Sequence, residues 1–186
     1  MEPPAAPPPP DVPPSTDNVS PGDGIPNGTA LITEIMQNPG GSDAGREWFE
    51  VYNPGADPID LIGWTIRDDD IDRHEIESHV MVPAAGYVVL AASPTVQGAV
   101  YSWNGELALA NGRDEIELVD NVGRVVDRVA WDDGRDFPDP SGASMNLDPS
   151  WLSPSENDDG HHWCESPASP TSAGDRGTPG APNPAC

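Results

Sequence analysis

The chain has 186 residues, with 32 aspartates and glutamates against 8 arginines and no lysine, so its formal charge is −24. This charge repels nucleic acid and anionic membranes, which excludes DNA and RNA as expected partners and favours cations or basic partners. No apolar run of about 18 residues is present, so no transmembrane helix is predicted. The length fits one domain of ordinary size with tails.

Residues 1–28 are dominated by proline, with alanine, aspartate, serine and glycine around it. Consecutive prolines favour extended polyproline II, which has no internal hydrogen bonds and buries nothing. We therefore expect a stiff spacer; the alternative is a docking peptide for an SH3-like partner, although basic flanking residues are absent. The start of the sequence lacks the pattern of a signal peptide, so any leader is expected to be absent from this chain.

Residues 31–55 are predicted to form a strand, a glycine-rich turn and a second strand. Ile32 and Ile35 stand among polar residues in the first strand, as in a half-buried strand. Residues 47–52 alternate strictly, with one face made of Trp48, Glu50 and Tyr52 and the other of Glu47, Phe49 and Val51. An Asn-Pro-Gly sequence ends each strand, because proline cannot donate to a ladder and glycine accepts positive φ.

Two further alternating segments follow. Residues 60–67 predict one strand with Trp64 in the core, since a large ring on an inward face is usually buried. Residues 73–81 predict the next strand, after an acidic turn at 68–72.

The middle of the chain continues this pattern with short apolar runs. Residues 87–92 are short enough for a buried strand. Residues 99–103 and 106–110 are predicted as two strands around Asn104-Gly105, a strong turn signal.

Residues 114–120 and 124–131 are predicted as a hairpin with a three-residue loop, followed by a short strand at 144–147. Asp127 interrupts the apolar face of the hairpin, and we expect a hydrogen-bonded polar group near the strand edge rather than a catalytic carboxylate. Strands and turns recur every 8 to 12 residues or so without a helical period. This spacing predicts an all-β, antiparallel sandwich of about seven to nine strands.

The acidic turn is the best candidate for a binding site. Asp68, Asp70 and Asp72 alternate, so their carboxylates can converge once the backbone curls, and hard oxygen ligands select calcium. The turn is not an EF-hand loop, because Arg73 stands where glycine is needed and His79 where a bidentate glutamate is needed. A solvated turn between strands is the alternative.

Weaker candidates lie elsewhere. The turns at 132–136 and 157–160 are also rich in carboxylate and amide oxygens. His161 and His162 are adjacent and point to opposite sides of an extended chain, which makes a poor chelating pair, although the two other histidines could join them at zinc.

Three tryptophans are poorly explained by strand alternation: Trp103, Trp151 and Trp163. Each is either a carbohydrate or protein contact or a packed core residue. Nucleophilic catalysis has no support, because no G-x-S-x-G elbow is present and no serine or cysteine can be paired with a histidine.

The combination of several stretches resembles a known family. These stretches are ITEIMQNP at 32–39, EWFEVYNPG at 47–55, IDLIGWTIRD at 59–68, IELVDNVGRVVDRVAW at 116–131 and the closing GTPGAPN at 177–183. They are similar to the lamin-tail domain, in particular to bacterial secreted members. The resemblance implies an immunoglobulin-like β-sandwich that serves binding and assembly. Chromatin contact is not expected here, because the chain has no heptad rod and no basic localisation segment, and its charge opposes DNA.

The expected organisation is a spacer at 1–28, a lamin-tail-like sandwich at 29–147 and an irregular tail at 148–186. Only two cysteines are present, so Cys164 is expected to pair with Cys186 and pin the tail, which suits an oxidising compartment.

The expected function is non-catalytic. We predict an exported module that binds or scaffolds at the cell envelope or outside the cell, with a protein or cell-surface glycan as partner and calcium as the candidate ion. The alternative is an accessory domain, or a metal-dependent hydrolase, of an extracellular enzyme.

Overall fold

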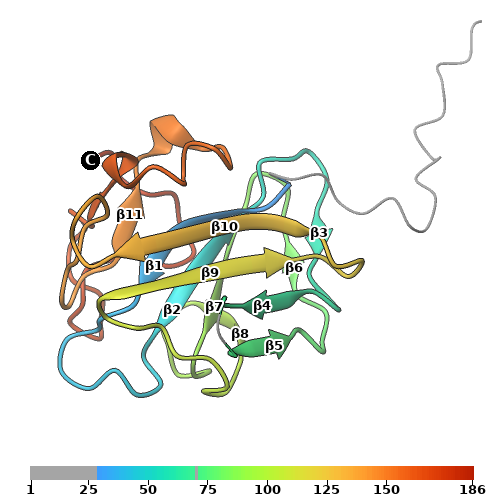
Figure 1. The fold of residues 1–186 in the computed structure, drawn as a ribbon, viewed down its shortest axis with the longest axis horizontal. Coiled ribbons are helices and arrows are strands. Elements are labelled where there is room, and N and C mark those ends of the chain that lie inside the picture. The colour runs from blue at the N-terminus through green and yellow to red at the C-terminus, as the bar shows by residue number, and fades with distance from the viewer. Residues whose placement is uncertain (1–28, 70) are drawn as a thin grey trace, which may run out of the picture.

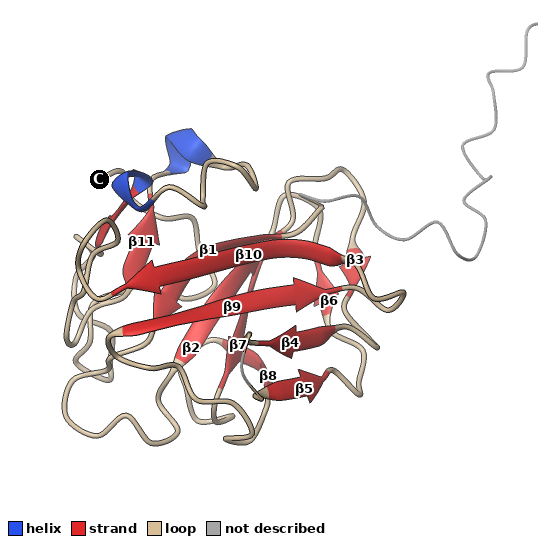
Figure 2. Cartoon of the chain, in the orientation of Figure 1, coloured by secondary structure: helices blue, strands red, loops and turns tan. Residues whose placement is uncertain are grey.

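The computed structural model describes residues 29–69 and 71–186, so the expected spacer at 1–28 and Asp70 lie outside the described residues. In this part of the chain, regular structure consists of twelve strands and two 3-10 helices, Pro149–Trp151 and Gly160–His162 (Figure 2). The all-β sandwich predicted from strand spacing is confirmed. The predicted number of strands is too low, because two predicted strands are divided and because β12 (Trp163–Glu165) is not predicted.

Six strands form the larger layer: β1 (Leu31–Met36), β2 (Trp48–Tyr52), β7 (Tyr87–Ala91), β8 (Ala99–Ser102), β11 (Met145–Leu147) and β12 (Trp163–Glu165). They lie in the order β12-β11-β1-β2-β7-β8. All pairs are antiparallel except β7 with β8, which run parallel. Two strands of this sheet are therefore supplied by the last quarter of the chain.

Four strands form the second layer: β4 (Thr65–Arg67), β5 (Arg73–Glu75), β9 (Arg113–Val119) and β10 (Val125–Asp132). Their order is β10-β9-β4-β5, and Figure 1 shows them crossing in front of the larger sheet. A two-stranded sheet of β3 (Ile59–Asp60) and β6 (Met81–Val82) lies at one end. The predicted β9–β10 hairpin is confirmed, with Val119 opposite Val125.

The main core fills the space between the layers. Its largest buried side chains include Trp64, Trp103, Phe49, Ile35, Leu90 and Ile116. The predicted alternation of β2 is confirmed, because Phe49 belongs to this core whereas Trp48 packs in a smaller cluster with Met36, Val89 and Ala91.

The single strand predicted at 60–67 is wrong, because the chain turns in the middle of it. β3 and β4 belong to different sheets, and Gly63 between them has a φ of +76°, which glycine adopts without strain. Leu61 and Trp64 consequently both reach the core, while Ile62 is 36% exposed.

Two other predicted strands are corrected. Residues 73–81 divide into β5 and β6, which lie in different sheets. Residues 106–110 form no strand, although Leu107 and Leu109 are buried. Their apolar pattern reflects packing against the core, where Trp103 donates its Nε1 hydrogen to the backbone oxygen of Leu107 over 2.9 Å.

Candidate functional site

Two glutamates lie side by side on the outer face of the six-stranded sheet. Glu34 of β1 and Glu50 of β2 are register partners, and both are completely buried. A β-bulge between Ile32 and Glu34 places an extra residue on β1. Thr33 therefore also reaches this face, and its hydroxyl donates to Glu50 Oε1 over 2.9 Å.

Residues 175–186, here called the C-terminal strap, cover both carboxylates. The backbone N and the hydroxyl of Thr178 donate to the two oxygens of Glu34 over 2.9 and 3.0 Å. The backbone N of Gly180 donates to Glu50 Oε2 over 2.8 Å. Ser144 donates its hydroxyl to Glu34 Oε1, so all four carboxylate oxygens accept a hydrogen bond.

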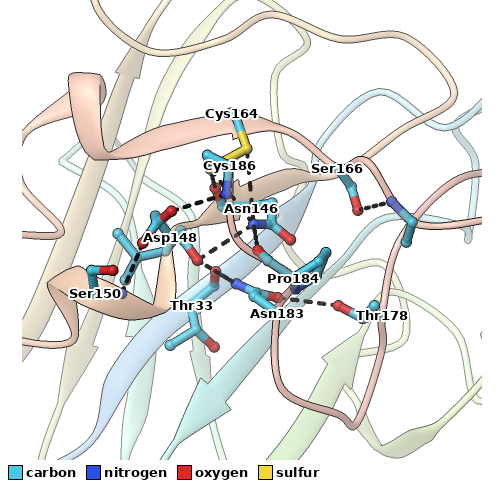
Figure 3. The surroundings of a disulfide bond; sticks show 12 residues. Thr33, Asn146, Asp148, Ser150, Cys164, Ser166, Thr178, Asn183, Pro184 and Cys186 are labelled. Atoms are coloured by element: carbon cyan, nitrogen blue, oxygen red, sulfur yellow. Dashed lines mark hydrogen bonds between the residues drawn. A yellow bond between two sulfur atoms is a disulfide. The ribbon is translucent and has the colours of Figure 1, made fainter.

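Asparagine amides fix the second half of the C-terminal strap (Figure 3). The Nδ2 of Asn183 donates to the backbone oxygens of Thr33 and Leu147 over 2.7 and 2.9 Å. From the sheet side, the Nδ2 of Asn146 donates to the backbone oxygen of Pro184 over 3.1 Å. The C-terminal strap is thus bound through buried polar side chains on both partners.

A disulfide closes the end of the C-terminal strap. Cys164 of β12 is bonded to Cys186, with their Cα atoms 5.9 Å apart (Figure 3). The backbone N of Cys186 also donates to Asp148 Oδ2 over 2.9 Å. The expected disulfide is present, and it ties the last residue of the chain to the sheet edge.

Burial raises the pKa of both glutamates above the ordinary range. For Glu50, burial together with the charge of Glu34 raises the pKa to about 8, although hydrogen bonds from Thr33 and the C-terminal strap oppose the shift. Burial also raises the pKa of Glu34, against hydrogen bonds from Ser144 and Thr178. At neutral pH the pair therefore keeps a proton that exposed carboxylates would release.

Sequence reasoning did not bring this pair together with the C-terminal strap. The sequence predicts strands around Glu34 and Glu50, and it gives residues 177–183 significance only through the family resemblance. Two signals were present: glutamates within strongly apolar strands, and a closing stretch at 177–186 without a charged side chain in a very acidic chain.

In the acidic turn, Asp68 and Asp72 accept hydrogen bonds from backbone N–H groups. Asp68 Oδ1 accepts from the backbone N of Asp72 over 3.0 Å, and Asp72 Oδ2 accepts from the backbone N of Ala108 over 3.1 Å. Asp70 lies outside the described residues. Within residues 29–69 and 71–186, no three histidine, cysteine, aspartate or glutamate side chains are grouped to hold a metal ion. Calcium at this turn stays a prediction.

The two other oxygen-rich turns meet at the surface. Asp132 and Asp136 from one turn, with Asp158 and Asp159 from the other, line an open depression. Gly160 packs directly against the chain there, since a Cβ on it would lie 2.5 Å from the carbonyl carbon of Asp136. Only glycine therefore fits at the contact between these turns.

Asp127 is buried and joins the two main sheets. Its Oδ2 accepts from the backbone N of Ile32 over 2.6 Å and from the Nδ2 of Asn157 over 2.8 Å. The bulge of β1 begins at Ile32, which leaves its N–H free for this contact. Burial raises the pKa of Asp127 to about 7. The carboxylate thus acts as a hydrogen-bond acceptor between sheets.

Each of the four histidines lies beside a different carboxylate. The pairs are His74 with Glu106, His79 with Asp60, His161 with Asp159 and His162 with Glu156. The structure does not bring the histidines together for zinc in the part of the chain that it describes. His74 instead links the two sheets at their edge, where its Nε2 lies 2.7 Å from the hydroxyl of Tyr101.

Two of the three tryptophans considered as contacts belong to the core. Trp103 is completely buried and stacks on Phe49, and Trp163 is 5% exposed. Trp151 is different, because it is 42% exposed and stacks flat on His162 with 4.1 Å between ring centres.

The comparisons with known proteins place most of the described sandwich in one family. The sequence model of the family described as Lamin Tail Domain matches residues 25–133, more than half of the chain. No curated protein matches the sequence. No helix among the described residues is long and apolar enough to cross a membrane. The match ends before β11 and β12, which complete the larger sheet, and before the C-terminal strap, which covers its outer face.

Proposed function

The chain belongs to the lamin tail domain family of immunoglobulin-like, non-enzymatic domains, and we propose that it is a non-catalytic, exported module that binds or scaffolds at the cell envelope or outside the cell. The observation that carries this proposal is the Cys164–Cys186 disulfide. Disulfides persist in oxidising compartments and are rare in the cytosol. Because the Cys164–Cys186 disulfide joins β12 to the C-terminal strap, it is a structural disulfide of the folded domain.

The arrangement of the buried ionisable groups supports a non-catalytic role. Glu34 and Glu50 are covered by the C-terminal strap, and Asp127 lies between the two sheets. Perturbed pKa values also arise in structural networks, and here the shifted carboxylates hold segments of backbone in place.

The exposed ring of Trp151 supports a binding role. The ring of Trp151 stacks on His162 and stays 42% exposed, so it can contact an apolar, aromatic or sugar partner at low entropic cost. We propose a protein or a cell-surface glycan as that partner. Calcium at Asp68, Asp70 and Asp72 would act as a stabilising ion.

Export is tested by following the native protein through cell fractions while labelling thiols with a maleimide reagent. We expect the protein in the envelope or the medium, with no reactive thiol before reduction and two after it. Recovery in the cytosol with two reactive thiols would contradict export.

The binding role is tested with Trp151→Ala in the full chain. We expect this variant to be retained less on purified envelopes at an unchanged melting temperature. Val100→Ala is the matched control, since Val100 is also an exposed apolar residue, 59% exposed on β8. Equal retention of wild type and both variants would rule out Trp151 as the contact.

A further inference from the structure

We propose that Asp127 and Asn157 share a proton in a cyclic pair of carboxylic acid and amide, and that this pair is a pH-sensitive latch that attaches residues 148–162 to the sandwich. Residues 148–162 connect β11 to β12. On one side of the pair, the Nδ2 of Asn157 donates to Asp127 Oδ2 over 2.8 Å. On the other side, protonated Asp127 donates its Oδ1 hydrogen to Asn157 Oδ1. This inference goes beyond the proposed function and does not depend on it.

Two buried oxygens of this pair lack a hydrogen-bond partner. Asp127 is 2% exposed and Asn157 is completely buried. Within residues 29–69 and 71–186, no group donates to Asp127 Oδ1 or to Asn157 Oδ1 with the geometry of a hydrogen bond. Buried acceptors are normally paired, because an unpaired one loses its contact with water without compensation. A hydrogen on Asp127 Oδ1 that points at Asn157 Oδ1 satisfies both atoms at once.

The remaining atoms of the pair fix how the two side chains face each other. Asp127 Oδ2 accepts from the backbone N of Ile32 and from the Nδ2 of Asn157. The same Nδ2 donates to the backbone oxygen of Ile32 over 3.3 Å, so the nitrogen and oxygen of the amide cannot change places without losing both bonds. The carboxyl and amide groups thus meet with Oδ2 opposite Nδ2, and the two Oδ1 atoms are left for the second hydrogen bond of the cyclic pair.

Asp120, at the turn of the β9–β10 hairpin, is a buried aspartate of the opposite kind. Its Oδ1 accepts from the backbone N of Val122 and of Arg124, and its Oδ2 accepts from Arg124 Nε. Burial works against the charged form, but these hydrogen bonds and the charge of Arg124 lower the pKa of Asp120 below its usual value. A buried aspartate with both oxygens paired is thus held as a carboxylate, whereas Asp127 has one oxygen without a donor.

The surroundings of Asp127 favour its protonated form. Burial raises the pKa of Asp127 to about 7, and the charge of Asp158 acts in the same direction, against hydrogen bonds from Ile32 and Asn157. The folded protein therefore holds a proton that the unfolded chain releases near the ordinary pKa of 3.8. The stabilisation by this proton is fully present below about pH 3.8 and is lost as the pH rises through about 7.

The other charged groups around Asp127 are engaged elsewhere. Arg128, the next residue of β10, pairs with Asp69 and with Glu117 of β9. Glu34, the one charged residue of β1, lies on the outer face of the sheet beneath the C-terminal strap. The charged side chains near Asn157 also pair with one another: Glu156 with His162, and Asp159 with His161.

Asn157 connects the latch to the rest of residues 148–162 and to the start of β12. Its backbone oxygen accepts from Trp163 Nε1 over 2.9 Å. When the proton on Asp127 leaves for solvent, the pair loses a hydrogen bond, and two oxygens, one of them charged, remain side by side. A rise in pH through the neutral range therefore weakens the attachment of residues 148–162 to β1 and β10, and acidification restores it.

The proton is tested directly in the wild-type full chain by the carbon-13 NMR signal of the Asp127 carboxyl group. We expect this signal to titrate with a midpoint near the pKa of about 7 that burial produces. A midpoint below about pH 5 would overturn the shared proton, because Asp127 would then be a carboxylate throughout the neutral range.

The latch is tested by hydrogen–deuterium exchange of the Trp163 indole N–H in the full chain. Between pH 5 and 7 we expect its protection, corrected for the intrinsic exchange rate, to fall by up to about tenfold for each pH unit. Asp127→Asn carries a permanent N–H donor in place of the acid hydrogen, so its Trp163 protection should stay constant over this range. Asp120→Asn is the matched control: it removes another buried carboxylate but leaves the latch, so its Trp163 should respond to pH as in the wild type.

Two outcomes would overturn the latch: a Trp163 protection that does not change with pH in the wild type, or the same pH dependence in Asp127→Asn as in the wild type. If Asp127→Asn does not fold, the carboxyl titration and the exchange of the wild type still decide, because neither needs the variant.

Discussion

Asp127 joins β1 to β10 through a single carboxylate oxygen that accepts two hydrogen bonds. Asp127→Ala would leave the N–H of Ile32 and the amide of Asn157 without this acceptor, so we expect a loss of about 1–3 kcal/mol in the free energy of unfolding. Asp127→Asn keeps an acceptor oxygen and should lose much less. Urea unfolding at constant m-value measures both. Equal losses of unfolding free energy in the two variants would contradict a stabilising role of the acceptor oxygen.

Glu50 makes stability depend on pH in a defined direction. Its pKa is raised from 4.5 to about 8 in the folded protein, so the folded state holds a proton that the unfolded chain releases. The contribution is fully present below about pH 4.5 and is lost as the pH rises through about 8. We therefore expect the free energy of unfolding to fall between about pH 5 and 8.5, by an amount on the order of a few kcal/mol.

Glu50→Gln is the matched control for this pH dependence, because glutamine keeps the shape of the side chain and cannot ionise. Glu34, Glu47 and Asp127, whose pKa values are also raised by burial, remain in both proteins. The difference between the two pH profiles hence reports Glu50 together with its coupling to Glu34. Parallel profiles would contradict the assignment.

Alternation predicts the face of a side chain well where the strand keeps a regular two-residue period. Alternation separates Phe49 from Trp48 correctly, because a two-residue period in a strand fixes which face each side chain takes. Trp64 lies in the core as predicted, although Leu61 is also buried and Ile62 is 36% exposed, so alternation is not the reason. The pairing of Glu34 with Glu50 was not predictable in this way. This pairing depends on a bulge that places both Thr33 and Glu34 on the outer face, and no local sequence pattern predicts the bulge.

Among the elements, the C-terminal strap depends most on its disulfide. Cys186→Ser opens a loop of about 22 residues, which in the chain-entropy model lowers the free energy of unfolding by about 3 kcal/mol. Thermal unfolding measures the loss, and reduction of the wild type should reproduce it. A change below about 0.5 kcal/mol in both experiments would mean that the C-terminal strap is held by its hydrogen bonds alone.

The acidic turn at 68–72 remains the element on which calcium is predicted to act. With a dissociation constant of about 0.1–1 mM, calcium at about 10 mM would add roughly 1.4–2.7 kcal/mol and raise the melting temperature by about 5–15 °C. Sodium chloride at matched ionic strength and magnesium are the controls. If sodium gives the same shift, or if Asp70→Asn leaves it unchanged, the turn is only solvated.

Elements with a complete local signal were predicted, and those that depend on distant contacts were not. The β9–β10 hairpin follows from its turn at 121–123. The division of 60–67 at Gly63 follows from the way the chain passes from one sheet to the other, and residues 106–110 are apolar because they cover the core. Neither the division at Gly63 nor the lack of a strand at 106–110 can be recognised from hydrophobic periodicity.

At the scale of the whole molecule, an acidic chain covers the outer face of its larger sheet with an uncharged C-terminal segment. The sequence predicts the sandwich and the disulfide, but the attachment of the last residues to Glu34 and Glu50 spans more than 125 positions in the chain. Such long-range contacts come from the assembled fold, so local patterns could not predict them. The central claim is that the C-terminal strap is part of the domain.

Hydrogen–deuterium exchange of the oxidised full chain, resolved to the amides of Thr178 and Gly180, tests this claim most directly. Both amides donate to buried carboxylates, so we expect them to exchange as slowly as the amides shared by β1 and β2. The exposed turn at Gly105 provides the fast reference. Exchange of Thr178 and Gly180 at the rate of Gly105 would contradict the account.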